Sequence, residues 1–180
     1  EHGWFDKRFM YDESFRTPLI IRWPGKLSGA ENHDLVQNID IAPTLLSAAG
    51  VEVPGHMHGR DLTPLIEGNT PEDWRMYVYY HYYDHPGVHW VARHEGVADA
   101  RYKLIRFYGP DVEGGEAWEF YDREPDPQEV HNQFGDQAYA DRIAAMKAEL
   151  LRLKAHYGYA PSIRHYPEEH RDLGIGPGSR

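Results

Sequence analysis

The chain has 180 residues, and its 41% hydrophobic, 13% aromatic and 27% charged residues are typical of one globular domain, or of one domain with a small appendix. Its formal net charge of −10 argues against nucleic acid as a general partner, because phosphate binding requires a basic face. There is no cysteine, which excludes disulfides and cysteine-based metal sites in this segment. No apolar run approaches the ~20 residues of a membrane span.

The chain begins with a loop dense in ionisable and aromatic side chains, residues 1–13, which leads directly into the apolar run of residues 18–23. This run is short, continuously apolar and bounded by Pro24-Gly25, and it predicts a strand buried on both faces of a parallel sheet. Loops that precede such strands often carry the chemistry of α/β enzymes. Because neither an initiator methionine nor a leading element precedes Glu1, we expect the loop to continue from a longer protein.

The next element is the clearest helix of the sequence, residues 40–50. Asp40 is a suitable N-cap, Pro43 is accepted in a first helical turn, and Gly50 ends the pattern. The first part of the chain therefore has the order strand, loop and helix, and we assign residues 1–70 to an α/β domain.

After residue 70 the pattern changes to short strands and one long helix. Strands with short connections, and hence antiparallel pairing, are predicted at residues 76–83, 95–100, 102–108 and 117–121. The longest helix is predicted at residues 136–156, where apolar side chains recur at helical spacing. An antiparallel sheet with one long helix is an α+β subdomain, which we assign to residues 71–157. Residues 158–180 are rich in proline, glycine and charge and predict an extended tail.

The N-terminal loop contains a candidate for anion binding. Lys7 lies among aromatic residues between Trp4 and Tyr11, whose rings offer an apolar enclosure for a point charge. His2 is close enough in sequence to share the site. The alternative for Lys7 is a solvated surface lysine, and Asp12 either orients the cations or caps the loop.

A second candidate is residues 81–96, which hold four histidines, one arginine and several aromatic side chains. Zinc binding is one interpretation, but the histidine spacings fall on a Pro/Gly loop and not on one helix face. An aromatic loop without a site is another. We favour substrate recognition, because histidine and arginine hydrogen-bond to hydroxyls, carboxylates or sulfate while tyrosine and tryptophan pack on rings.

Blocks of residues across the chain resemble one known family. They are Glu1-His2-Gly3, Lys7, Tyr11-Asp12-Glu13, residues 17–25, 40–46 and 58–62, Arg101-Tyr102-Lys103-Leu104-Ile105, Glu119-Phe120-Tyr121-Asp122, residues 126–129 and Asn132. In this order they are similar to the sulfatases of the alkaline-phosphatase superfamily, over roughly residues 1–157. The chain looks most like sulfatases of sulfated glycans, such as those acting on 6-sulfated N-acetylglucosamine.

The resemblance implies an α/β fold, the C-terminal part of a sulfatase-like sandwich that ends near residue 70, followed by the α+β subdomain. In this family a formylglycine, made within a Cys/Ser-x-Pro-x-Arg motif, attacks the sulfate sulfur, and a calcium ion polarises the ester. The motif is absent here, so we expect formylglycine and the Ca2+ ligands upstream, no metal ligand in this segment, and no activity of the segment alone. Lys7 takes the position of the sulfate-contacting lysine, with His2 as a second catalytic residue.

The resemblance also implies that the C-terminal subdomain contacts the substrate. Arg93 and His94 are the first candidates for this role, followed by His85, His89 and His81. The implied partners are a sulfated carbohydrate and the upstream part of the same protein. The implied compartment is periplasmic or extracellular, because enzymes of this kind are exported.

Two other functions remain open. A phosphodiesterase or phosphonate hydrolase of the same superfamily is one, because Glu1-His2-Gly3 can supply an additional metal ligand. A non-catalytic glycan-binding fragment that is stable by itself is the other.

Overall fold

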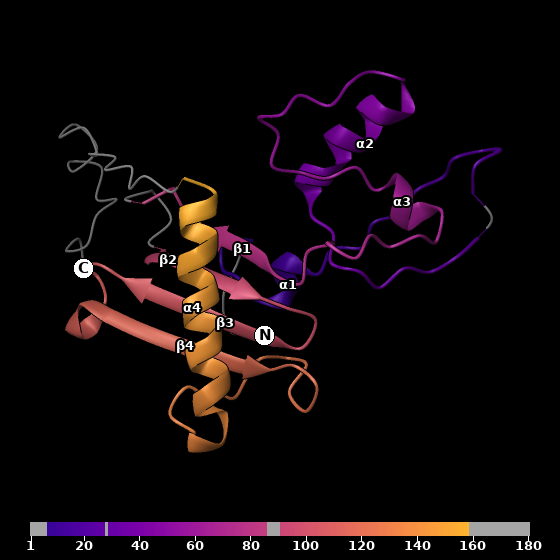
Figure 1. Ribbon diagram of the computed structural model, residues 1–180. Coiled ribbons are helices and arrows are strands. Elements are labelled where there is room, and N and C mark those ends of the chain that lie inside the picture. The colour runs from indigo at the N-terminus through magenta and orange to yellow at the C-terminus, as the bar shows by residue number, and fades with distance from the viewer. Residues whose placement is uncertain (1–6, 28, 86–90, 159–180) are drawn as a thin grey trace. The chain divides into compact units, whose positions relative to one another are not determined.

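The computed structural model describes residues 7–27, 29–85 and 91–158. The chain divides into two compact units (Figure 1). In the described part, one unit comprises residues 7–17 with 79–158, and the other comprises residues 18–78. No helix among these described residues is long and apolar enough to cross a membrane.

The unit of residues 18–78 contains short helices joined by irregular chain. They are the 3-10 turn η1 (Asn38–Asp40), α2 (Ile41–Ala48) and α3 (Thr63–Ile66). The predicted helix is confirmed by α2, and Gly50 follows it with φ 70°, a left-handed conformation that glycine adopts without strain. Asp40 does not cap α2 with its side chain; its carboxylate is buried and forms a bidentate ion pair with Arg75.

The strand predicted at residues 18–23 is wrong for this structure. The segment belongs to no helix or strand, and Leu19, Ile20 and Ile21 are 43%, 89% and 38% exposed. A strand is stable when a neighbour satisfies its backbone hydrogen bonds, and the described part of residues 24–77 contains no strand to pair with it. An apolar run of residues therefore forms a buried strand only where a neighbouring strand is present to pair with it.

The other unit is built on a four-stranded sheet with strand order β1-β2-β3-β4 (Figure 1). The strands are β1 (Val78–His81), β2 (Arg93–Ala98), β3 (Tyr102–Tyr108) and β4 (Glu116–Asp122), with a 3-10 turn η2 (Glu113–Gly115) before the last. β2 pairs antiparallel with β3, and β3 with β4. Between β2 and β3, the Asp99 carboxylate accepts the backbone N–H groups of Arg101 and Tyr102. The predicted antiparallel sheet is confirmed.

One face of this sheet is covered by α4 (Ala140–His156), which crosses the strands in Figure 1. A 3-10 turn η3 (Gln137–Tyr139) leads into it, and the Asp136 side chain accepts the N–H of Ala138 there. The buried side chains of α4 recur at helical spacing, as the sequence predicts: Ile143, Met146, Leu150 and Leu153.

Residues 7–17, with the short helix α1 (Asp12–Phe15), pack on the sheet face opposite α4. Side chains of a strand alternate between faces: Glu95 reaches Lys154 of α4, whereas its neighbour His94 stacks on Phe9. Gly96 also faces this segment, because a Cβ at Gly96 would lie 2.4 Å from Met10 Sδ. The sheet is therefore covered on both sides, once by a helix and once by the N-terminal segment.

Candidate functional site

The two candidate regions of the sequence meet in the structure. The Tyr80 hydroxyl of β1 donates to the carbonyl oxygen of Arg8 at 3.0 Å, and the Phe15 ring meets the Tyr80 ring edge-on at 4.8 Å. Phe9 stacks on His94 of β2 with ring centroids 5.5 Å apart. The segment that carries Lys7 is thus attached to the strands that flank the histidine-rich loop, and Lys7 itself is exposed at its end.

His94 is an interior residue of this arrangement. It has no exposed surface, its ring stacks on Tyr82 at 5.1 Å, and its Nδ1 lies 2.9 Å from the carbonyl oxygen of Ala92. Burial lowers the pKa of His94 to about 4, although the backbone of Ala92 and Arg8 acts in the opposite direction. Burial therefore favours the neutral imidazole, whose Nδ1 lies within hydrogen-bond distance of the Ala92 carbonyl oxygen.

His81 lies on the opposite face of the sheet, under α4. Its side chain is 5% exposed, with Nδ1 3.5 Å from Glu95 Oε2 and Nε2 3.4 Å from the Tyr108 hydroxyl. Burial alone would raise the pKa of Glu95, but the adjacent His81, Lys154 and Arg106 side chains lower it to about 2. The structure thus separates His81 from His94, since the two face opposite sides of one sheet.

Two further predicted residues, Arg93 and His85, lie on either side of residues 86–90. Arg93 begins β2 and is partly exposed, and strand alternation directs it away from the face of His94. His85 is held at both ring nitrogens, with Nδ1 2.9 Å from the Val91 carbonyl oxygen and Nε2 2.9 Å from Asp111 Oδ2. His2 and His89 lie outside the described residues.

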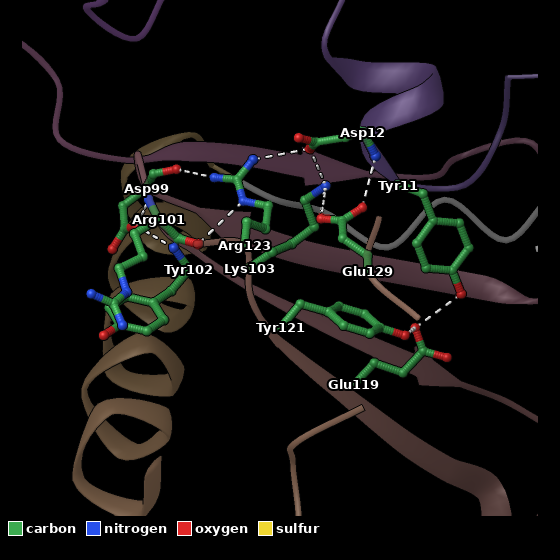
Figure 2. Close-up of polar contacts among 10 residues, drawn as sticks. All are labelled: Tyr11, Asp12, Asp99, Arg101, Tyr102, Lys103, Glu119, Tyr121, Arg123 and Glu129. Carbon is green, nitrogen blue, oxygen red and sulfur yellow. Dashed lines mark hydrogen bonds and ion pairs between the residues drawn. The ribbon is translucent and has the colours of Figure 1, made fainter. Parts of the chain in front are cut away.

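A cluster of buried charges beneath α1 was not predicted as a site (Figure 2). Lys103 of β3 has no exposed surface, and its Nζ lies 2.7 Å from Asp12 Oδ1 and 2.5 Å from Glu129 Oε1. Arg123 Nη1 lies 2.9 Å from the same Asp12 oxygen, and Glu129 Oε2 accepts the backbone N–H of Asp12 at 2.8 Å. The available signal was Lys103 beside the apolar residues Leu104 and Ile105 within a predicted strand.

The ionisation of the two carboxylates differs within this cluster. Burial alone would raise the pKa of Asp12, but Lys103 and Arg123 hold it below its ordinary value. Burial raises the pKa of Glu129 above its ordinary value, even though Lys103 acts against the shift. Asp12 is thus the carboxylate of the cluster that stays ionised, and two cations bind it.

The neighbouring residue Tyr11 is held from β4. Its hydroxyl donates to Glu119 Oε2 at 2.9 Å, and the Tyr121 hydroxyl donates to the same oxygen at 3.0 Å (Figure 2). Burial and the Glu119 charge raise the pKa of both phenols well above the ordinary value. Both tyrosines are therefore permanent hydrogen-bond donors to Glu119.

The calcium ion implied by the resemblance does not fit the described residues. They contain no group of three or more histidine, aspartate or glutamate side chains that could hold a metal ion. The carboxylates of Asp12 and Glu129 are instead occupied by Lys103 and Arg123.

The fold and the sequence motifs define a segment of a sulfatase. The family model for the C-terminal part of N-sulphoglucosamine sulphohydrolase matches residues 1–156, and the chain belongs to this family. The resemblance to sulfatases and the predicted fold class are thereby confirmed.

Curated relatives agree with this family. The chain is 47% identical over 156 residues to an N-acetylglucosamine-6-O-sulfatase of Bacteroides thetaiotaomicron, an alignment that covers 85% of this chain and 26% of the relative. It is 31% identical over 171 residues to the multifunctional alkaline phosphatase superfamily protein PehA of Trinickia caryophylli, covering 83% of this chain and 32% of the relative. The chain thus spans about a quarter to a third of the length of these relatives.

Solved structures give the same result. The structure of BT4656 in complex with its substrate D-glucosamine-2-N,6-O-disulfate superimposes with a TM-score of 0.80 at 44% identity, covering 92% of this chain and 33% of the other. The phosphonate monoester hydrolase from Silicibacter pomeroyi superimposes with a TM-score of 0.70 at 29% identity, covering 84% of this chain and 31% of the other.

Proposed function

We propose that the protein to which this chain belongs is a sulfatase that hydrolyses a sulfate ester of a carbohydrate, with 6-O-sulfated glucosamine residues as the substrate class. The observation that carries the proposal is the 47% identity, over 85% of the chain, to a relative named as an N-acetylglucosamine-6-O-sulfatase. The neighbouring structure that holds a disulfated glucosamine as its substrate supports the same class.

Lys7 is the proposed sulfate-binding residue of this segment, with His2 beside it. Lys7 is exposed and lies at the end of a segment that is held against the sheet by Arg8, Phe9 and Tyr11. An ammonium group placed in this way stabilises the negative charge that develops on the sulfate oxygens during transfer. Formylglycine and Ca2+, whose ligands we place upstream of this segment, supply the nucleophile and the polarisation of the ester.

Recognition of the sugar is proposed for the histidine-rich loop and its flanking strands. Arg93 and His89 are the residues proposed to contact the carbohydrate directly. His85, whose ring nitrogens are held by Val91 and Asp111, is proposed to fix the start of the loop. The side chains of His81 and His94 are buried, so their proposed contribution to substrate binding is to hold the backbone on either side of the loop. The further partner is the upstream part of the same protein, and the proposed compartment is periplasmic or extracellular.

The test is a comparison of substrates with the full-length protein. Hydrolysis of N-acetylglucosamine 6-sulfate and of p-nitrophenyl sulfate is expected, with little activity on bis(p-nitrophenyl) phosphate. Mass spectrometry of the intact protein should find formylglycine, and a chelator should abolish the activity. A protein that hydrolyses only the phosphate diester would contradict the proposal.

A phosphonate or phosphodiester hydrolase is the second candidate. It is favoured by the TM-score of 0.70 with a phosphonate monoester hydrolase and by the 31% identity to the protein PehA. Both values are lower than those for the sulfated-glucosamine relatives, and this difference is why the sulfatase is proposed first.

A further inference from the structure

Sequence blocks without an assigned role meet at one place in the structure. Lys103 lies in the middle of the block of residues 101–105, Glu129 ends the block of residues 126–129, and both contact Asp12 (Figure 2). Asp12 belongs to the N-terminal segment, which also carries Lys7. Blocks that are far apart in the sequence thus act on the segment of the proposed sulfate-binding lysine.

We propose that Lys103, Glu129 and Arg123 are positioning residues for Lys7, which they hold by clamping Asp12 against the sheet. The proposal rests on the proposed sulfatase function of the whole protein. These residues do not touch the sulfate; they act through the backbone between Asp12 and Lys7.

The clamp holds both the side chain and the backbone of Asp12. Its carboxylate is bound by Lys103 Nζ at 2.7 Å and by Arg123 Nη1 at 2.9 Å. Lys103 lies in β3, and Arg123 directly follows the last residue of β4. Its backbone N–H donates to Glu129 Oε2 at 2.8 Å. Asp12 is the first residue of α1, where a backbone N–H has no partner within the helix, so Glu129 supplies the missing acceptor.

Burial makes this clamp specific to one position. Lys103 and Glu129 have 0% and 1% of their surface exposed, so neither finds water as an alternative partner. Removal of one partner from a buried charge pair leaves the other uncompensated, which strongly disfavours displaced arrangements of Asp12. A surface ion pair would tolerate such displacement.

The backbone of Glu129 indicates the same role. Its φ is 55°, and no other described residue except glycine has a positive φ. Such strain persists only where the surrounding contacts determine the conformation. Here the Glu129 N–H donates to the Asp126 carbonyl oxygen at 3.1 Å. The Glu129 carboxylate forms an ion pair with Lys103 and accepts the backbone N–H of Asp12.

A second attachment holds the adjacent residue. The Tyr11 hydroxyl donates to Glu119 of β4, while Met10 and Phe9 are buried against the sheet. The segment is thus held continuously from Phe9 to Asp12, directly after Lys7. The Asp12 clamp completes this row of attachments, and its loss is proposed to loosen the segment and with it the position of Lys7.

The test is a double-mutant cycle in the full-length sulfatase. Lys103→Met and the milder Glu129→Gln are each combined with Lys7→Ala. In the wild-type background, Lys103→Met and Glu129→Gln should lower kcat about 10- to 100-fold, the range that a misplacement of the order of 1 Å produces. In the Lys7→Ala background, the same substitutions should lower kcat by less than about 2-fold, because residues that act as a unit are not additive.

A purely structural role would give a different result. Variants would then lose activity by the same factor in both backgrounds, in proportion to the fraction of unfolded protein, and this outcome would overturn the proposal. Lys147→Met is the matched control, because Lys147 lies over the rings of Trp118 and Phe134 on the other face of the sheet. Its kcat should be unchanged in both backgrounds.

A readout without substrate separates this proposal from the proposed function. Amide hydrogen exchange of the full-length protein should rise in residues 7–17 for Glu129→Gln and Lys103→Met, while β2 and β3 stay protected. Unchanged exchange in residues 7–17 would refute the clamp even if the enzyme is a sulfatase. Increased exchange in a protein without sulfatase activity would refute the function of Lys7 and leave the clamp in place.

Discussion

Two buried ionisable side chains on the same sheet face, Lys103 and His94, are accommodated in opposite ways. Lys103 is paired with two carboxylates, so its charge is kept inside the protein. His94 is surrounded by the rings of Phe9, Tyr82 and Phe107, which offer no counter-charge. Its position is therefore compatible with the neutral imidazole only.

This difference predicts a pH dependence of stability. Folding lowers the pKa of His94 from 6.5 to about 4, so between these values the unfolded state binds more protons than the folded state. The contribution of His94 is complete above about pH 6.5, is reduced by about 2 kcal/mol at pH 5, and is lost as the pH falls further towards 4.

The measurement compares the wild-type full-length protein with His94→Phe. The decrease in melting temperature between pH 7.5 and pH 5 should be smaller in the variant, which has no proton to take up at this position. Glu95 does not interfere with this measurement. Folding lowers its pKa from 4.5 to about 2, so its contribution to stability is lost only below pH 4.5, outside the range from pH 7.5 to pH 5. Equal pH slopes in the two proteins would contradict the burial of a neutral His94.

A second prediction at this scale concerns Lys7. Its replacement in Lys7→Ala should lower kcat of the full-length enzyme about 100- to 1000-fold, corresponding to about 3–4 kcal/mol of lost transition-state stabilisation. The matched control is Lys26→Ala, since Lys26 is 56% exposed and pairs only loosely with Glu67 at 3.9 Å. Steady-state kinetics with N-acetylglucosamine 6-sulfate measure both variants, and near-normal turnover of Lys7→Ala would contradict the role of Lys7.

At the scale of elements, α4 was predicted from its helical period, and β2 to β4 were predicted as short strands with short connections. Each of these elements buries one face against a neighbour within the same unit, so the structure that its sequence favours locally is also the one that tertiary packing stabilises. Residues 18–23 have the same apolar character but no strand to pair with, and they remain exposed. The short helix α1 was not predicted, because its first N–H is capped by Glu129 from a distant part of the chain.

The burial pattern of α4 gives a prediction with an internal control. Leu150 is 2% exposed and Leu151 is 66% exposed, so two leucines side by side in the sequence differ only in their environment. Leu150→Ala should lower the free energy of unfolding by about 2–5 kcal/mol, because it leaves a cavity between α4 and the sheet. Leu151→Ala should change it by less than about 0.5 kcal/mol. Chemical denaturation of the two variants of the full-length protein measures the difference, and equal losses would contradict the packing of α4.

At the scale of the whole molecule, the proposed active site combines Lys7 of this chain with a nucleophile that we place upstream. No Cys/Ser-x-Pro-x-Arg sequence is present, and the described residues hold no metal cluster. Apolar side chains such as Ile20 and Leu45 are 89% and 64% exposed in the unit of residues 18–78. Exposed apolar side chains of this kind are expected where a segment packs against further parts of a longer protein.

The chain produced alone is therefore expected to hydrolyse neither N-acetylglucosamine 6-sulfate nor p-nitrophenyl sulfate above the uncatalysed rate. The full-length protein, assayed in parallel, serves as the positive control. Activity of the isolated chain that disappears in Lys7→Ala would show that the segment contains a complete site, and would contradict the proposed upstream nucleophile.

The sequence by itself determined the family, the antiparallel sheet and the long helix. These depend on local periodicity and on motif order, which a single chain displays directly. The tertiary structure decided that His81 and His94 face opposite sides of the sheet, and that Lys103 and Glu129 clamp Asp12. The Asp12 contacts join residues 91 and 117 positions apart in the chain, and no local pattern encodes which buried charges meet over that separation. The pairing of these buried charges affects stability, because a charge inside the protein is costly unless a partner of opposite charge compensates it.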